Sequence, residues 1–289
     1  MSRTHHNPFS AYHPAVALTY LVCAAGFAMA AMQPVYAGIS LAGALACTTC
    51  VRGKEALRSG AWLLALVALV AGANLLFVGE GSTPLFTFGE RAFTLEALLY
   101  GLCSGVMLAA VFMWMTSYAA CMDSAATTAL IGRAWPTVAL MISQVMRLVP
   151  QFARRGRTVA SALAATPAAA PHGARERTAN NLRTVSVLMG WGLEDSLARA
   201  DSMRARGYAC GAKRTTYRRY RLRRADVVVL AATVALVLVN IPLTAIACVQ
   251  YSFYPTPPQL VAWWGYLPYA AFMLLPAVLS LREWWLWSA

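Results

Sequence analysis

Apolar residues in this chain are gathered in long runs, and shorter polar segments separate them. Six of these runs are close to the length of about 20 residues that an α-helix needs to cross the hydrocarbon core of a bilayer. The runs cover residues 14–32, 34–51, 61–79, 95–118, 225–249 and 259–281. The first run is too long for a typical signal peptide, and another membrane segment follows at once, so a cleaved leader is not expected. The pattern predicts an all-α polytopic membrane protein with about six transmembrane helices.

The segment between the fourth and fifth runs has a different character. Residues 119–224 are polar and basic, and they predict a water-facing helical domain inserted into the membrane body. The membrane body is thereby divided into an N-terminal domain with four spans, residues 1–118, and a C-terminal hairpin with two spans, residues 225–289.

Three helices are predicted in the later part of this insertion. Residues 134–149 are apolar but contain Gln144 and Arg147, so a short re-entrant, interfacial or protein-buried helix is expected between the prolines at 136 and 150. Residues 151–165 predict a separate basic amphipathic helix, and the prolines and glycine of residues 166–173 predict a loop.

The third of these helices has the clearest apolar stripe. At about 100° per residue, seven positions fall within a sector of about 120°. These seven residues, called the seam below, are Leu182, Val185, Met189, Leu193, Leu197, Ala200 and Met203. The seam is expected to face other helices of the chain or of a partner. Arg199 lies off the seam, where it is expected to pair with Asp195 or Asp201, and Gly207 or Gly211 is expected to end the helix.

Lysine and arginine residues are distributed very unevenly. Of the 24 in the chain, 18 lie in residues 119–224, and only Arg91 lies in a segment expected on the opposite side of the membrane. The positive-inside rule therefore places both termini and the insertion in the cytoplasm. The net charge of +13 is explained by this bias, together with the attraction of basic residues to anionic lipid head groups. The basic run of residues 213–224 contains only two aromatic residues, Tyr217 and Tyr220, and the bias of basic residues toward one side accounts for the charge, so nucleic-acid binding is not expected.

Candidate catalytic chemistry is sparse. The chain has no phosphate-cradling loop, no Ser/His/Asp set and no paired carboxylates near a predicted cleft, so no enzymatic activity, cofactor or metal is expected. Cys47 and Cys50 lie in a predicted span and are expected to be packing residues, and His5, His6 and His13 are expected in a flexible tail. The amides expected to form hydrogen bonds between helices are Asn74, Gln144 and Asn240.

A longer pattern occurs at residues 196–208, which are Ser-Leu-Ala-Arg-Ala-Asp-Ser-Met-Arg-Ala-Arg-Gly-Tyr. This is a helical segment that ends in Ala-Arg-Gly followed by an aromatic residue. Together with His13-Pro14 at the first span and Arg147-x-x-Pro150 in the insertion, it resembles the transmembrane T component (EcfT/CbiQ type) of energy-coupling factor (ECF) transporters. These are a branch of the ABC importers, and they take up vitamins or metal ions such as cobalt. The resemblance covers nearly the whole chain.

The resemblance implies a non-catalytic scaffold in a bacterial or archaeal cell (inner) membrane. In such transporters, two helices of the insertion each dock an arginine motif in a groove of one of two ATPase subunits, which hydrolyse ATP. The remaining coupling helices hold a membrane-embedded S component that binds the substrate. The residues that would dock an ATPase here are Ala205, Arg206 and Gly207, with the adjacent Arg204.

The earlier arginine motif is degenerate in this sequence. The resemblance places it about fifteen residues after Pro150, where the chain has Ala164, Ala165 and Thr166 and no arginine. Contact with one ATPase is therefore expected to differ from the family pattern. The alternative functions are an integral membrane enzyme or a self-contained permease with a basic cytoplasmic face. A permease would need strongly polar residues in several spans, and these are nearly absent.

Overall fold

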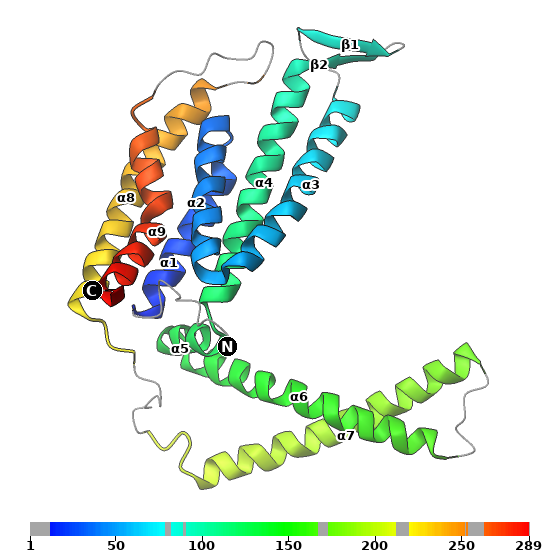
Figure 1. Ribbon diagram of the computed structural model, residues 1–289. Coiled ribbons are helices and arrows are strands. Elements are labelled where there is room, and N and C mark those ends of the chain that lie inside the picture. Colours follow the sequence, from blue (N-terminus) through cyan, green and yellow to red (C-terminus); the bar gives the residue numbers. More distant parts are fainter. Residues whose placement is uncertain are drawn as a thin grey trace. The chain divides into compact units, whose positions relative to one another are not determined.

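The computed structural model describes residues 12–78, 82–88, 91–166, 173–211, 220–251, 253 and 263–288. Within these residues it has nine helices and one two-stranded hairpin (Figure 1). The helices are α1 (Pro14–Ala30), α2 (Pro34–Arg52), α3 (Lys54–Phe77), α4 (Leu95–Cys121), α5 (Ser124–Ala134), α6 (Pro136–Ala164), α7 (Ala174–Ala205), α8 (Arg224–Gln250) and α9 (Tyr266–Ser288). The strands are β1 (Pro84–Phe88) and β2 (Arg91–Thr94).

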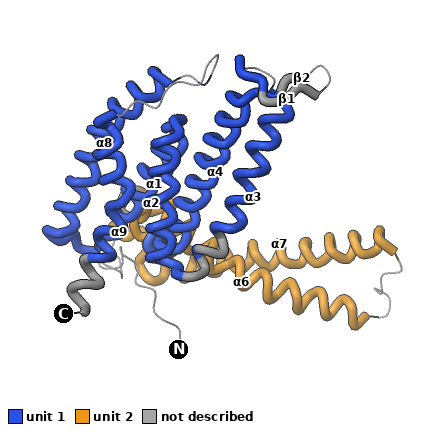
Figure 2. Tube along the Cα trace, turned by 45° about the horizontal axis from the view of Figure 1, so that its top comes forward, with its two compact units in different colours: residues 1–127, 220–289 blue, residues 128–219 orange. Residues whose placement is uncertain are grey.

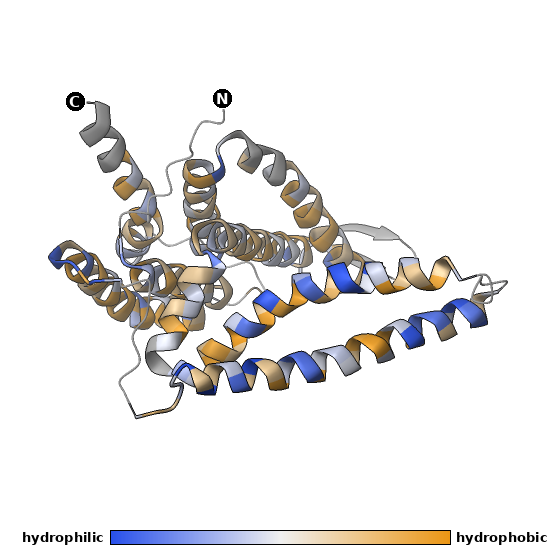
Figure 3. Cartoon of the chain, turned by 90° about the horizontal axis from the view of Figure 1, so that it is seen from below, coloured by the Kyte–Doolittle hydropathy of each residue, from blue (hydrophilic) through white to orange (hydrophobic). Residues whose placement is uncertain are grey.

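The chain forms two compact units, shown in different colours in Figure 2. Unit 1 consists of Met1–Thr127 and Tyr220–Ala289, and unit 2 consists of Thr128–Arg219. Unit 1 therefore contains α1 to α4, α8, α9 and the hairpin, whereas α6 and α7 belong to unit 2. In Figure 3 the helices of unit 1 are mostly hydrophobic, and α6 and α7 alternate between hydrophobic and hydrophilic positions.

Four of the described helices are long and apolar enough to cross a membrane: Pro34–Arg52, Gly60–Phe77, Leu95–Cys121 and Arg224–Gln250. These helices indicate a membrane protein, and the predicted all-α class is confirmed apart from the hairpin. The first and last predicted spans correspond to shorter apolar helices, Pro14–Ala30 and Tyr266–Leu281. Residues 259–262 of the last predicted run lie outside the described residues.

The helices of unit 1 pack closely where one of them presents small residues. Gly101 and Gly105 of α4 face α3. A Cβ on Gly101 would lie 2.9 Å from the Cβ of Asn74, and a Cβ on Gly105 would lie 3.1 Å from the Cα of Val67. Such small residues at a four-residue spacing let two helix backbones approach, which strengthens van der Waals packing in a bilayer.

Polar side chains inside unit 1 bond between helices, as predicted for Asn74 and Asn240. Asn74 Nδ2 of α3 donates to the Ala97 carbonyl of α4 at 2.6 Å. Asn240 Nδ2 of α8 donates to the Pro268 carbonyl of α9 at 3.3 Å. Because hydrocarbon offers no partners for amide groups, such bonds pair polar atoms that lipid could not satisfy.

Tyr20 of α1 compensates for a proline in α9. Pro276 has no N–H, so the carbonyl four residues earlier, that of Phe272, lacks its helical partner. The fully buried Tyr20 hydroxyl donates to this carbonyl at 3.0 Å. A proline inside α9 is thus tolerated because a neighbouring helix supplies the missing donor.

His13 does not lie in a flexible tail, so that prediction was wrong for this residue. It is only 7% exposed and precedes α1 as its N-cap, with its Nδ1 accepting the Ala15 N–H at 3.1 Å. Pro14 follows at the first helical position, where its missing N–H costs nothing. An acceptor at the N-cap pairs an N–H that has no partner within the helix. His5 and His6 lie outside the described residues.

The hairpin was not predicted. β1 and β2 pair antiparallel with Phe86 opposite Phe93 and Phe88 opposite Arg91. Aromatic and β-branched residues on both sides of a Gly-Glu pair were the available signal in the sequence.

The insertion contains one long helix where two were predicted. α6 runs from Pro136 to Ala164 without a break at Pro150. A proline inside a helix costs about 3 kcal/mol in isolation. Here the helix continues because residues on both sides of Pro150 contact α7: Gln144 before it, and Gln151 and Phe152 after it. Tertiary packing therefore overrides the local tendency to stop.

Candidate functional site

The end of α7 carries the Ala205-Arg206-Gly207 motif in a closed turn. Gly207 has φ +81°, a left-handed conformation that glycine adopts without steric cost. Its N–H donates to the Arg204 carbonyl at 2.9 Å, and the Tyr208 N–H donates to the Met203 carbonyl at 3.0 Å. These two bonds define a Schellman motif, which pairs the last carbonyls of the helix. The predicted stop at Gly207 is confirmed.

This turn presents its arginines to solvent. The Arg204 side chain is 80% exposed and lies 4.0 Å from Asp201, a distance at which an exposed pair contributes little. Arg206 is also exposed, and it forms no ion pair with another described residue. Ala205 and Gly207 add no bulk on either side of it. The guanidinium is therefore available for planar, two-bond recognition of a carboxylate or a pair of carbonyls.

Further back along α7, an aromatic cluster fixes the crossing with α6, which is visible in Figure 1. A Cβ on Gly192 would lie 2.7 Å from Phe152 Cζ, so a larger residue there would require this ring to shift. The Phe152 and Trp191 rings meet edge to face with centroids 5.3 Å apart. Arg155 Cζ lies 3.6 Å from the Trp191 ring centroid, a cation–π contact that ties the two helices together.

This cluster was not predicted from the sequence. Arg155 was counted only as part of a basic helix face, although its side chain covers Trp191. The available signal was a tryptophan between two glycines, Gly190 and Gly192, because small residues beside a large ring allow another helix to approach.

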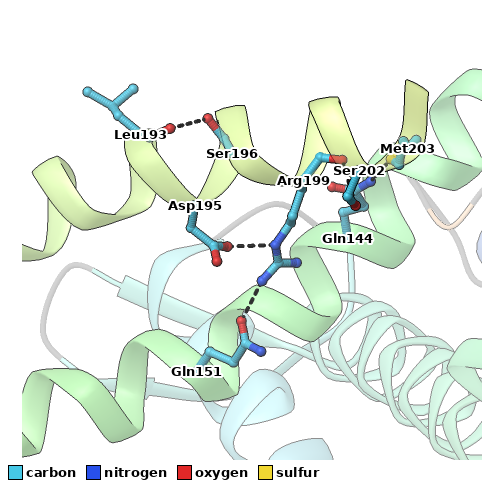
Figure 4. A network of polar contacts seen from close by, with 8 residues as sticks. All are labelled: Gln144, Gln151, Leu193, Asp195, Ser196, Arg199, Ser202 and Met203. Atoms are coloured by element: carbon cyan, nitrogen blue, oxygen red, sulfur yellow. Dashed lines mark hydrogen bonds and ion pairs between the residues drawn. The ribbon is translucent and has the colours of Figure 1, made fainter. Parts of the chain in front are cut away.

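Between this crossing and the α7 turn lies a polar network, drawn in Figure 4. Arg199 Nε pairs with Asp195 at 2.6 Å, so the predicted pairing along the helix is confirmed for Asp195. Arg199 Nη2 also donates to Gln151 Oε1 of α6 at 2.7 Å, which the sequence did not predict. Gln144 Nε2 donates to Met203 Sδ at 3.3 Å, so this amide also bonds between helices, as predicted.

Apart from Met203, the seam residues do not carry the contact with α6. Leu182, Met189 and Leu193 are 64%, 65% and 69% exposed, although a helix of this chain was one expected partner of their face. Of the seven seam residues, Met203 makes the contact with Gln144. α6 packs instead on the face with Trp191, Gly192 and Arg199, because glycine permits a closer approach there than a row of large side chains does. The rest of the seam is left as an exposed apolar stripe.

Residues 164–166, where the resemblance would place an earlier arginine motif, have a different geometry. α6 ends at Ala164, and its C-cap Ala165 has φ −75°, so the helix end lacks the left-handed residue found at Gly207. Thr166 bonds back to the helix through Oγ1 to the Ala162 carbonyl at 3.2 Å. Among the described residues of α6 the last arginine is Arg157, seven positions before Ala164, whereas the α7 end presents two arginines. The ends of the two long helices are therefore not equivalent.

Metal chemistry has no support in the part of the chain that the structure describes, where no three His, Cys, Asp or Glu side chains are grouped to hold an ion. Cys47 is fully buried, and Cys50 Sγ contacts Ser280 Oγ at 3.2 Å. No family model matches the chain, and no curated protein matches it either.

Proposed function

We propose that this protein is the transmembrane T component of an ECF-type ABC importer. It would act as a scaffold that passes the conformational change of two ATPase subunits to a separate, membrane-embedded S component. The observation that carries the proposal is the Schellman turn at the end of α7. It holds Arg206 exposed, between two small residues and without an ion pair to any described residue.

We place six spans in the membrane: α1, α2, α3, α4, α8 and α9. α1 has 17 residues and α9 has 23. At 1.5 Å per residue, α1 is about 26 Å long, and the bilayer can thin by the few ångströms that are missing. Both helices contribute fully buried residues such as Tyr20 and Phe272, which supports placing them among the other spans. The bias of basic residues puts both termini and unit 2 in the cytoplasm.

Docking to an ATPase would use the turn at the end of α7. The planar guanidinium of Arg206 suits carboxylate or carbonyl groups in a groove of the ATPase. The small residues beside it, Ala205 and Gly207, let the helix end enter that groove. The described residues at the end of α6, Ala164 to Thr166, include neither a left-handed residue nor an arginine. We therefore expect the two ATPase contacts to be asymmetric, with the firmer one at Arg206.

The S component would bind the exposed part of the seam. A stripe of large apolar side chains on a helix with charged flanks has the character of a partner-binding surface. The cluster around Trp191 and the Arg199 network would make α6 follow α7 when the docked end is displaced. ATP hydrolysis and substrate recognition would reside in the partner subunits, with a vitamin or a metal ion as cargo.

The docking claim is tested with Arg206→Glu. The matched control is Arg183→Glu, which reverses the charge of another exposed α7 arginine far from the turn. Affinity-tagged chain is purified from native membranes, and co-purified ATPase subunits are quantified by mass spectrometry. We expect Arg206→Glu to lose the ATPases and Arg183→Glu to retain them. Normal co-purification with Arg206→Glu, at an unchanged yield of folded chain, would refute the docking role.

The seam is tested with Leu193→Lys, and Val187→Lys serves as the control. Both residues are exposed on α7, at 69% and 55%, but Val187 lies off the seam. Neither change should unfold the helix, because lysine is a good helix former. Leu193→Lys should remove the S component from the purified complex while the ATPases remain. Equal losses from both variants would show that the seam is not the binding surface. Substrate flux through the chain reconstituted alone would instead support the permease alternative.

A further inference from the structure

A buried carboxylate lies at the start of α8. Asp226 is 2% exposed and occupies the third position of the helix. Its Oδ2 accepts the N–H of the N-cap residue Arg223 at 2.8 Å. This is one half of a capping box, the usual role of an acidic residue at this position.

The other oxygen of the same carboxylate belongs to a second helix start. Asp226 Oδ1 accepts the N–H of His13, the N-cap of α1, at 3.1 Å across 213 residues of sequence. Asp226 forms no ion pair with a described residue. The buried negative charge is instead compensated by the partial positive charges of two helix N-termini. One side chain thus pairs the N-cap N–H groups of α1 and α8.

This junction lies where the chain returns from unit 2. Unit 1 resumes at Tyr220, whose ring meets the His13 ring nearly edge to face with centroids 5.8 Å apart. The segment from Tyr220 to Arg223 is therefore tied to the start of α1 at both ends. Tyr220 contacts the His13 ring, and the Arg223 N–H bonds to the same carboxylate as the His13 N–H. The chain that leaves unit 2 enters unit 1 at this point.

We propose that Asp226 and the N–H groups of His13 and Arg223 form a latch, which makes the starts of α1 and α8 respond together to a pull from unit 2. Both bonds share one rigid carboxylate group. Loss of the Arg223 bond removes one of the two restraints on the Asp226 side chain, and the bond to His13 then weakens as well. The coupling is a property of unit 1 and holds whatever partner unit 2 binds.

The test is amide hydrogen exchange at single-residue resolution on the full chain in lipid nanodiscs. Arg223→Pro deletes the N–H but leaves Asp226 in place, and the φ of −90° at Arg223 is near the range of proline. Leu222→Pro is the matched control, because it introduces the same ring one residue earlier and keeps the Arg223 N–H.

We expect Arg223→Pro to speed exchange of the His13 amide by up to about tenfold, because its bond to Asp226 weakens but is not deleted; outright loss of a bond to a charged group would give roughly tenfold to a hundredfold. Leu222→Pro should change it little. Asp226→Asn, which keeps one acceptor oxygen, should speed exchange at one or both of His13 and Arg223, whereas Asp123→Asn on the surface should not. An unchanged His13 amide in Arg223→Pro, or an equal effect of Leu222→Pro, would overturn the latch.

Discussion

Replacing Arg199 tests whether α6 and α7 move as one body. Its guanidinium lies 2.6 Å from Asp195 on its own helix and 2.7 Å from Gln151 on α6 (Figure 4). The two contacts predict different consequences. If the pair with Asp195 dominates, Arg199 stabilises α7 alone. If the bond to Gln151 dominates, Arg199 holds the two helices together.

The structure favours the contact between helices. The Arg199 and Asp195 side chains are 23% and 26% exposed, so water screens their attraction. A pair four residues apart on a helix contributes only about 0.3–0.5 kcal/mol under such conditions. A charged donor on a neutral acceptor contributes more, about 1–2 kcal/mol after allowance for partial exposure. Arg199→Met keeps the long stem and the helix propensity, so it removes mainly these polar contacts.

The assay is a pair of double-mutant cycles on the purified full chain in bicelles. Spin labels at the exposed residues Ser161 and Ser186 report the distance between α6 and α7 during denaturant titration. We expect a coupling energy of about 1 kcal/mol between Arg199→Met and Gln151→Leu, and at most about 0.5 kcal/mol between Arg199→Met and Asp195→Asn.

The control for this experiment is Arg204→Met. The Arg204 side chain is 80% exposed and 4.0 Å from Asp201, so its loss should change the free energy of unfolding by less than about 0.5 kcal/mol. The reverse order of couplings, with Asp195 above Gln151, would show that Arg199 acts within α7. The proposed transmission from the docked turn to α6 would then lose this contact as its support.

Two further predictions follow from single backbone contacts. Gly207→Ala forces alanine into φ +81° and should lower the free energy of unfolding by about 1–2 kcal/mol. Amide hydrogen exchange at Tyr208 should become faster as the turn opens, with Gly207→Asn giving an intermediate rate. Unchanged exchange at Tyr208 would contradict this account. Tyr20→Phe should destabilise the protein by about 1–2 kcal/mol, because the Phe272 carbonyl loses its donor. The destabilisation by Tyr20→Phe should be smaller in a Pro276→Ala background, because the new N–H of residue 276 reaches the Phe272 carbonyl. If the effects of Tyr20→Phe and Pro276→Ala on thermal unfolding are additive, Tyr20 does not compensate for Pro276.

Much of the helical architecture could be predicted from the sequence because its causes are local. A run of apolar residues is enough to form a helix in hydrocarbon, where backbone groups must bond within the segment. The stop at Gly207 is local for a similar reason, since few residues other than glycine adopt the left-handed conformation. The predicted pairing of Arg199 with Asp195 required only a spacing of four residues on one helix.

The predictions that failed depended on contacts between segments distant in the sequence. Pro150 was expected to end a helix, and α6 continues because α7 packs along it. The seam was expected to face other helices of the chain or of a partner, and the sequence did not predict that α6 would pack on another face of α7, where Gly192 admits Phe152. His13 was assigned to a flexible tail, although Asp226 lies beside its N–H in the folded chain.

The sequence by itself determined the helices, the uneven placement of basic residues and the turn that exposes Arg206. Each of these depends on residues a few positions apart, where backbone geometry and side-chain spacing are fixed by the helix. Only the tertiary structure decided which face of α7 meets α6 and which helix starts share the carboxylate of Asp226. The packing face of α7 depends on how closely two helix backbones can approach, and the position of Asp226 depends on hydrogen-bond donors from two distant segments. The periodicity of one segment determines neither of these.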